Sequence, residues 1–72
     1  MNRDEFLKEF QEVIQSEDEL TFEQDLNDID EWDSLSVMAT IAFIDKNFGI
    51  KVSHKDIIEM KTIDDIAKKV GL

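Results

Sequence analysis

Residues 33–49 read DSLSVMATIAFIDKNFG, and this stretch decides how the chain folds. Gly49 closes it, at the position where helices commonly end in the left-handed conformation. The stretch therefore predicts a main helix over about Ser34–Phe48. Large apolar residues recur within that helix at i, i+4, i+7 and i+11, the spacing of one helix face: Val37, Ile41, Ile44 and Phe48.

The segment before this helix is strongly acidic. Residues 17–33 carry nine acidic side chains and no basic one. A connection of this length is either functional or disordered, and we expect an ordered one, held to the core by its apolar residues. Ser34 stands where the loop becomes a helix, so its hydroxyl should be exposed. A phosphate on it would lie near free N–H groups and the positive end of the helix dipole.

Three more helices are expected around the main one. The first begins near Asn2, buries an apolar stripe at 3.6-residue spacing and ends near Gln15. A short third helix follows Ser53, with an acidic residue at the third helical position, and runs to about Met60. The same signal recurs at Thr62, where the last helix begins.

The composition agrees with a small helical protein. Among 72 residues there are no Pro, two Gly and 42% hydrophobic residues. The sequence predicts one all-α domain over residues 1–72. We expect a small four-helix bundle, with three main helices, a short third helix and a long ordered loop between the first two. Because Cys is absent and His54 is the only His, we expect no metal site.

Charge is unevenly distributed along the chain. Residues 1–33 hold 13 acidic and 2 basic side chains, which gives −11, whereas residues 34–72 hold 5 and 6, which gives +1. Nucleic acid is a poor partner for the acidic half, and a basic protein surface is a better one. No apolar run approaches the roughly 20 residues of a membrane span, so we expect no membrane insertion. We expect a cytoplasmic monomer.

Catalysis by Ser34 is not expected. A nucleophilic serine needs an adjacent base and an orienting group, and His54 is the only imidazole. His54 lies about 20 residues away at the start of another helix, where we expect it to be solvent-exposed. The sequence therefore predicts a protein that is not an enzyme.

Three segments together resemble the acyl carrier protein family, or more broadly the phosphopantetheine-binding carriers. These are Trp32-Asp33-Ser34-Leu35, the Phe48–Val52 stretch and the start of the last helix at Thr62–Asp65. The resemblance implies that a phosphopantetheinyl transferase esterifies Ser34 with 4′-phosphopantetheine from coenzyme A. The thiol of this arm would carry acyl groups as thioesters to enzymes of fatty acid or specialised acyl and peptide biosynthesis.

The resemblance also assigns roles along the main helix. Asp33 would help to place the transferase's metal and Ser34. The outward face of the helix would be read by the transferase and the biosynthetic enzymes, and the space between the second and third helices would shelter the acyl chain. For recognition this points to Asp33, Leu35, Met38, Ala39, Ala42 and Asp45. For the acyl-chain interior it points to Val37, Ile41, Ile44, Ile58 and Met60.

Two features depart from the fatty-acid type of carrier. Trp32 stands before Asp-Ser-Leu where those carriers usually have Gly, and the main helix has fewer acidic residues on its outward face. Both features are more typical of carriers that serve peptide or specialised acyl synthesis.

An unmodified acidic module is the alternative interpretation. In that case residues 17–33 would bind a basic protein partner through charge alone. Such binding should weaken steeply with salt and should not depend on Ser34.

Overall fold

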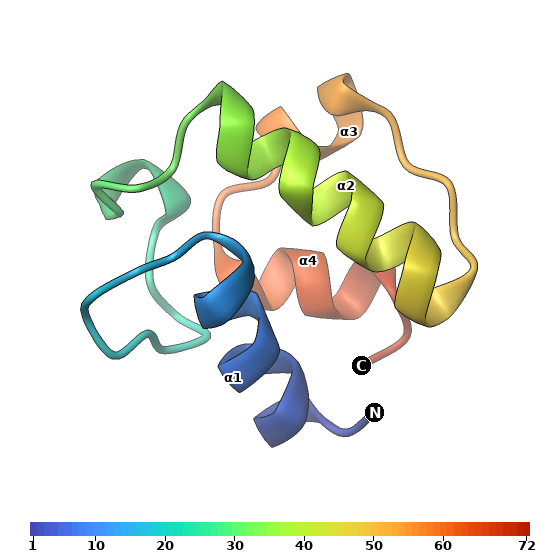
Figure 1. Cartoon of the computed structure of the whole chain (residues 1–72), viewed down its shortest axis with the longest axis horizontal. Helices are drawn as coiled ribbons and strands as arrows, with labels where there is room; N and C mark the ends of the chain where they lie inside the picture. Colours follow the sequence, from blue (N-terminus) through green and yellow to red (C-terminus); the bar gives the residue numbers. More distant parts are fainter.

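The computed structural model describes all of residues 1–72 and contains no β-strand. In Figure 1, α2 runs along the upper side of the molecule, α4 and α1 lie below it, and the two ends of the chain lie close together. This architecture confirms the predicted all-α bundle with a short third helix. Its elements are α1 (Arg3–Val13), the 3-10 helix η1 (Leu26–Asp28), α2 (Ser34–Phe48), α3 (His54–Ile58) and α4 (Ile63–Lys69).

Helix α1 is capped at both ends. The Asn2 side chain accepts a hydrogen bond from the N–H of Glu5 at 2.8 Å, and the Glu5 carboxylate accepts from the N–H of Asn2 at 3.2 Å. This reciprocal capping box fixes the first turn. At the other end Gln15 has a φ of 57°, and the N–H of Ser16 donates back to the carbonyl of Gln11 at 3.1 Å. The left-handed residue ends the helix where the sequence predicted.

The long connection between α1 and α2 is ordered, as predicted. Leu20, Leu26 and Ile29 are buried, while Phe22 and Trp32 are half-buried against the core. Its backbone is also tied to the segment before α4. The N–H of Leu26 donates to the carbonyl of Lys61 at 2.8 Å, and the N–H of Asp64 donates to the carbonyl of Phe22 at 2.9 Å.

Helix α2 buries a wider face than the apolar spacing predicted. Val37 and Ile44 are buried, but Ile41 and Phe48 are only half-buried. Thr40 and Phe43, outside the predicted stripe, are buried instead. The reason is that α2 packs on α1 with one side and on α3 with another, so the buried arc exceeds a single stripe. Gly49 ends α2 with a φ of 67°, as predicted.

Helices α3 and α4 begin at the predicted caps. Ser53 and Asp56 form a capping box at α3, and Thr62 and Asp65 form another at α4. Helix α3 ends at Ile58, two residues before the predicted end. The apolar residues predicted to be buried in α4 are buried: Ile63, Ile66, Ala67 and Val70.

One core joins all four helices. Its 15 buried apolar residues form a single cluster. Phe6 lies fully buried within it, and its ring centroid lies 6.0 Å from that of Phe10, 5.9 Å from that of Phe43 and 6.2 Å from that of Phe48. These aromatic contacts fix α1 against α2.

Candidate functional site

The start of α2 is held by two residues that cap each other. Asp33 is the N-cap, and its carboxylate accepts a hydrogen bond from the N–H of Ser36 at 2.9 Å. The Ser36 hydroxyl oxygen in turn accepts from the N–H of Asp33 at 2.8 Å. The Asp-x-x-Ser spacing is that of a capping box, so the sequence contained a signal for Ser36 that the interpretation above missed.

Two serines near this cap therefore differ in what they can do. Ser36 is 6% exposed, and its hydroxyl donates to the carbonyl of Glu31 at 2.7 Å. Ser34, the first residue of α2, is exposed, and the hydrogen bonds of the cap do not use its hydroxyl. Only the Ser34 hydroxyl is both accessible and uncommitted.

The surroundings of Ser34 suit a phosphate. The N–H groups at the first positions of a helix have no intrahelical carbonyl partner, and the helix dipole is positive there. The Asp33 carboxylate accepts from the N–H of Ser36, and the N–H of Ser34, at the first position of the helix, has no intrahelical carbonyl partner. A phosphoryl group on the Ser34 oxygen therefore fits this helix start.

Asp33 remains ionised beside that position. Hydrogen bonds from the backbone N–H and the hydroxyl of Ser36 hold the pKa of Asp33 below its ordinary value of 3.8. At neutral pH the site thus carries a fixed negative charge one residue before Ser34. A carboxylate in this place can attract a metal ion or a basic side chain of an incoming enzyme.

Trp32 fixes the chain just ahead of this cap. Its ring centroid lies 5.9 Å from that of Phe10 in α1. The indole is half-buried against the core, where a Gly would make no such contact. Trp32 therefore anchors the end of the acidic connection and thereby positions Asp33.

The residues expected to meet partner enzymes lie on the surface. Leu35 is 77% exposed and Met38 is 61% exposed, which excludes a core role for either. Ala42 and Asp45 are also exposed, and Ala39 is half-buried. The structure thus brings these side chains to the outward side of α2, with Leu35 and Met38 in the first turns after Ser34 and Asp45 near the other end. Their use by partner enzymes remains a prediction.

One residue expected in the acyl-chain interior is not there. Ile58 is 55% exposed, so its predicted interior position was wrong. Its neighbour Ile57 is fully buried and fills the inward position, and successive helical residues point about 100° apart. Val37 and Ile44 are buried, and the remaining two are half-buried: Ile41 and Met60.

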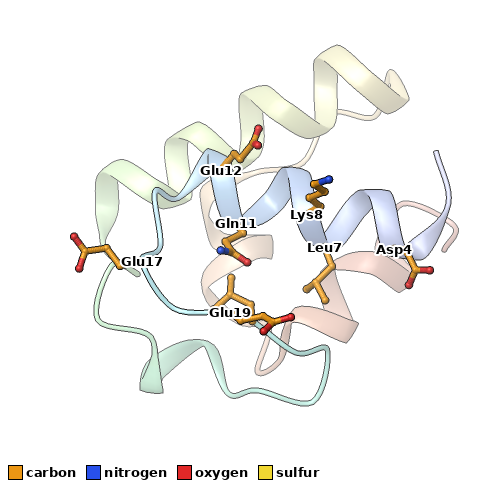
Figure 2. A pocket seen from close by; sticks show the side chains of 8 residues that line it. Asp4, Leu7, Lys8, Gln11, Glu12, Glu17 and Glu19 are labelled. Carbon is orange, nitrogen blue, oxygen red and sulfur yellow. The ribbon is translucent and has the colours of Figure 1, made fainter.

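Of three surface hollows, the one with the greatest volume lies away from Ser34, between α1 and the acidic connection. Its volume is about 600 Å³, and only Leu7 and Leu20 among its eight lining residues are apolar. In Figure 2 the carboxylates of Glu12 and Glu17 point in different directions rather than converging. No group of three or more His, Cys, Asp or Glu side chains in the structure could hold a metal ion. This hollow lacks the largely apolar lining of small-molecule sites.

Comparison with known proteins identifies the family of the chain. Residues 4–70 match the family model described as the phosphopantetheine attachment site. The chain belongs to this family. It is a carrier domain, not a catalytic one, and the family's prosthetic group is 4′-phosphopantetheine. Carrier domains are modified by phosphopantetheinyl transferases and serve partner enzymes.

Two other comparisons found no protein similar to the carrier. Neither the curated proteins nor the solved structures contained a match to it. None of its helices is long and apolar enough to cross a membrane.

Proposed function

We propose that Ser34 is the residue to which the 4′-phosphopantetheine of this carrier is attached. The observation that carries the proposal is the contrast between the two serines at the start of α2. Ser34 is exposed and outside the hydrogen bonds of the cap, whereas the Ser36 hydroxyl is buried and bonded to the carbonyl of Glu31. The helix start can also stabilise the attached phosphate.

The attachment is a phosphoryl transfer from coenzyme A. The Ser34 oxygen forms a bond to the phosphorus that carries pantetheine, the pyrophosphate bond of coenzyme A breaks, and the adenosine nucleotide leaves. The proton of the serine hydroxyl passes to a base of the transferase. The chain supplies the exposed oxygen and the adjacent Asp33 carboxylate, which attracts the cationic parts of that enzyme. Once attached, the arm supplies a thiol, which a chain without Cys lacks, for holding acyl groups as thioesters.

We further propose that the chain works as a discrete carrier. All of its buried apolar residues belong to one cluster, so residues 1–72 need no second unit to complete their core. The exposed apolar side of α2, with Leu35 and Met38, supports docking of biosynthetic enzymes beside the arm. The few acidic residues on α2, together with Trp32, favour a specialised acyl or peptide pathway over housekeeping fatty acid synthesis.

The decisive experiment is an intact mass measurement after incubation with coenzyme A, magnesium and a broad-specificity phosphopantetheinyl transferase. We expect a gain of one phosphopantetheine unit, mapped to Ser34 by fragmentation. A Ser34→Ala variant should fold and gain nothing. A Ser36→Ala variant is the matched control, because it damages the cap but keeps the Ser34 hydroxyl, and it should still be modified.

Two results would overturn the assignment. Modification of the Ser34→Ala variant would place the arm elsewhere. An unmodified but folded protein, beside an active control carrier, would instead favour the acidic module. That alternative predicts that a basic partner binds residues 17–33 with an affinity that falls with salt and is unchanged in Ser34→Ala.

A further inference from the structure

A second hollow lies next to Ser34, between the end of α1 and the start of α2. Its volume is about 420 Å³, within the range of about 300–1,000 Å³ that is typical of ligand pockets. Asp33 and Leu35, the two residues that flank Ser34, both line it. A group attached to Ser34 therefore begins its path at the edge of this hollow.

The lining combines an apolar part with a few polar groups. Val13 is the last residue of α1 and Ile14 caps that helix, while Leu35 and Ala39 come from α2. The polar side chains are those of Gln15, Glu31, Asp33 and Ser36, of which Ser36 is committed to the cap. Half of the eight lining residues are apolar and half are polar, so the hollow offers both apolar contact and hydrogen-bonding groups.

The chemistry of pantetheine matches this lining. Its geminal methyl groups need apolar contact, which the side chains of Val13, Ile14 and Ala39 can provide. Its two amides need hydrogen-bond partners. The Glu31 carboxylate can accept from an amide N–H, and the Gln15 side chain can donate to an amide carbonyl. The pantetheine part of the arm is uncharged, so the acidic groups of the hollow do not repel it.

We propose that the phosphopantetheine arm folds back into this hollow between α1 and α2 when no partner enzyme is bound. The proposal rests on attachment at Ser34. A group tethered at the edge of a site has an effective concentration in the millimolar range, so even a weak intrinsic affinity fills the site. Weak binding also suits a carrier, because a partner enzyme can withdraw the arm.

The opposite side of α2 offers the arm less space. Ile44 of α2 and Ile57 of α3 are both fully buried in the core there. None of the five residues expected to form an acyl-chain interior lines any of three surface hollows, which include the one beside α1 and the one beside Ser34. The hollow beside Ser34 is lined instead by Leu35, whose exposed side chain the arm can partly cover.

The test is an isotope-filtered nuclear Overhauser experiment on the modified protein. The chain is labelled with ¹³C, and the arm comes from unlabelled coenzyme A, so that only contacts between arm and chain are detected. We expect contacts from the geminal methyl groups of the arm to the methyl groups of Val13, Ile14 and Ala39. An Ala39→Phe variant should fill the hollow and lose these contacts. Lys46→Phe, a control at an exposed position of α2 outside the expected recognition residues, should keep them.

The outcomes separate this inference from the assignment of Ser34. The mass of the sample is measured first, and absence of the arm from a folded protein counts against Ser34 and against the fold-back together. If the arm is attached but contacts Ile41 or Met60, or contacts no methyl group of the chain, the fold-back into this hollow is wrong while Ser34 stands. Loss of the contacts in Lys46→Phe as well as in Ala39→Phe would also overturn it.

Discussion

Asp33 and Ser36 exchange two hydrogen bonds across the first turn of α2, from N–H to Oγ at 2.8 Å and from N–H to Oδ1 at 2.9 Å. This pair performs the capping that Ser34 could otherwise have supplied. Ser34 is thereby free of any structural duty at the helix start. The residues that cap α2 are therefore Asp33 and Ser36, whereas Ser34, the first residue of the helix, keeps an exposed hydroxyl.

Substitutions of the two serines should therefore have opposite consequences. Ser36→Ala removes the acceptor for the N–H of Asp33 and the donor to Glu31, and should lower the free energy of unfolding by about 1–2 kcal/mol. Ser34→Ala should change it by less than about 0.5 kcal/mol, because the side chain is exposed. Urea denaturation of the unmodified proteins measures both values. Equal losses in the two variants would contradict this division.

Local signals predicted most of the helix boundaries. The starts of α3 and α4 follow from Ser53 and Thr62, whose side chains each accept a hydrogen bond from the N–H three residues on. Gly49 ends α2 for an equally local reason, since glycine adopts a positive φ without strain. Such features depend only on neighbours in the sequence, and this is why they could be read without the structure.

Features that depend on tertiary packing could not be predicted in this way. Phe43 is buried because α1 supplies Phe6 beside it, and no pattern within α2 shows this. Ile57 takes the inward position of the short helix α3, and Ile58, the last residue of that helix, therefore points toward solvent. The left-handed Gln15 had no signal either, because the residue type disfavours the conformation that the fold imposes.

Arg3 should contribute more to stability than other surface cations. It donates to the carbonyl of Leu72 at 2.6 Å, pairs with Asp64, and lies 4.2 Å from the ring centroid of Phe22. Its side chain is 41% exposed, and solvent screening therefore limits how much the ion pair with Asp64 contributes to stability. We expect Arg3→Ala to lower the free energy of unfolding by about 1–2 kcal/mol. Arg3→Lys should recover only part of this loss, because a Lys cannot make the same forked contacts.

The control for Arg3 is a cation with a single exposed partner. Lys51 pairs with Asp45 at 3.3 Å, and both side chains are largely exposed. Lys51→Ala should change the free energy of unfolding by less than about 0.5 kcal/mol. Chemical denaturation at one salt concentration compares the variants. A loss in Lys51→Ala as large as that in Arg3→Ala would show that bulk charge, rather than the contacts of Arg3, is responsible.

Gln15 should be a site where glycine stabilises the protein. Its φ of 57° is unfavourable for a residue with a Cβ, and glycine adopts it freely. After subtracting the greater flexibility of glycine in the unfolded chain, we expect Gln15→Gly to raise the free energy of unfolding by about 0.5–1 kcal/mol. Gln15→Ala retains the Cβ and should give no gain. Thermal melting of the natural chain, Gln15→Gly and Gln15→Ala measures these differences. Equal stability of the Gly and Ala variants would contradict the prediction.

Acid should weaken the protein through its capping carboxylates. Hydrogen bonds from the backbone N–H groups of Thr62 and Lys61 lower the pKa of Asp65 from 3.8, and Arg3 followed by Lys68 lowers that of Asp64. A carboxyl whose pKa is lower in the folded state stabilises the fold above its unfolded pKa. That contribution disappears as the pH falls through the folded value. We therefore expect stability from these groups to be lost as the pH falls below about 4.

The variant Asp65→Asn isolates this effect from the general repulsion among 18 acidic side chains. Both hydrogen bonds to Asp65 reach the same oxygen, Oδ2, at 3.0 and 3.1 Å, so an amide oxygen can accept them without the charge. The variant should be less stable than the natural chain near neutral pH, and the difference should shrink as the pH falls below 3.8. Asp30→Asn, an exposed residue that caps no helix, controls for the change in net charge. A stability difference for Asp65→Asn that stays constant with pH would show that this carboxylate does not stabilise the fold through its charge.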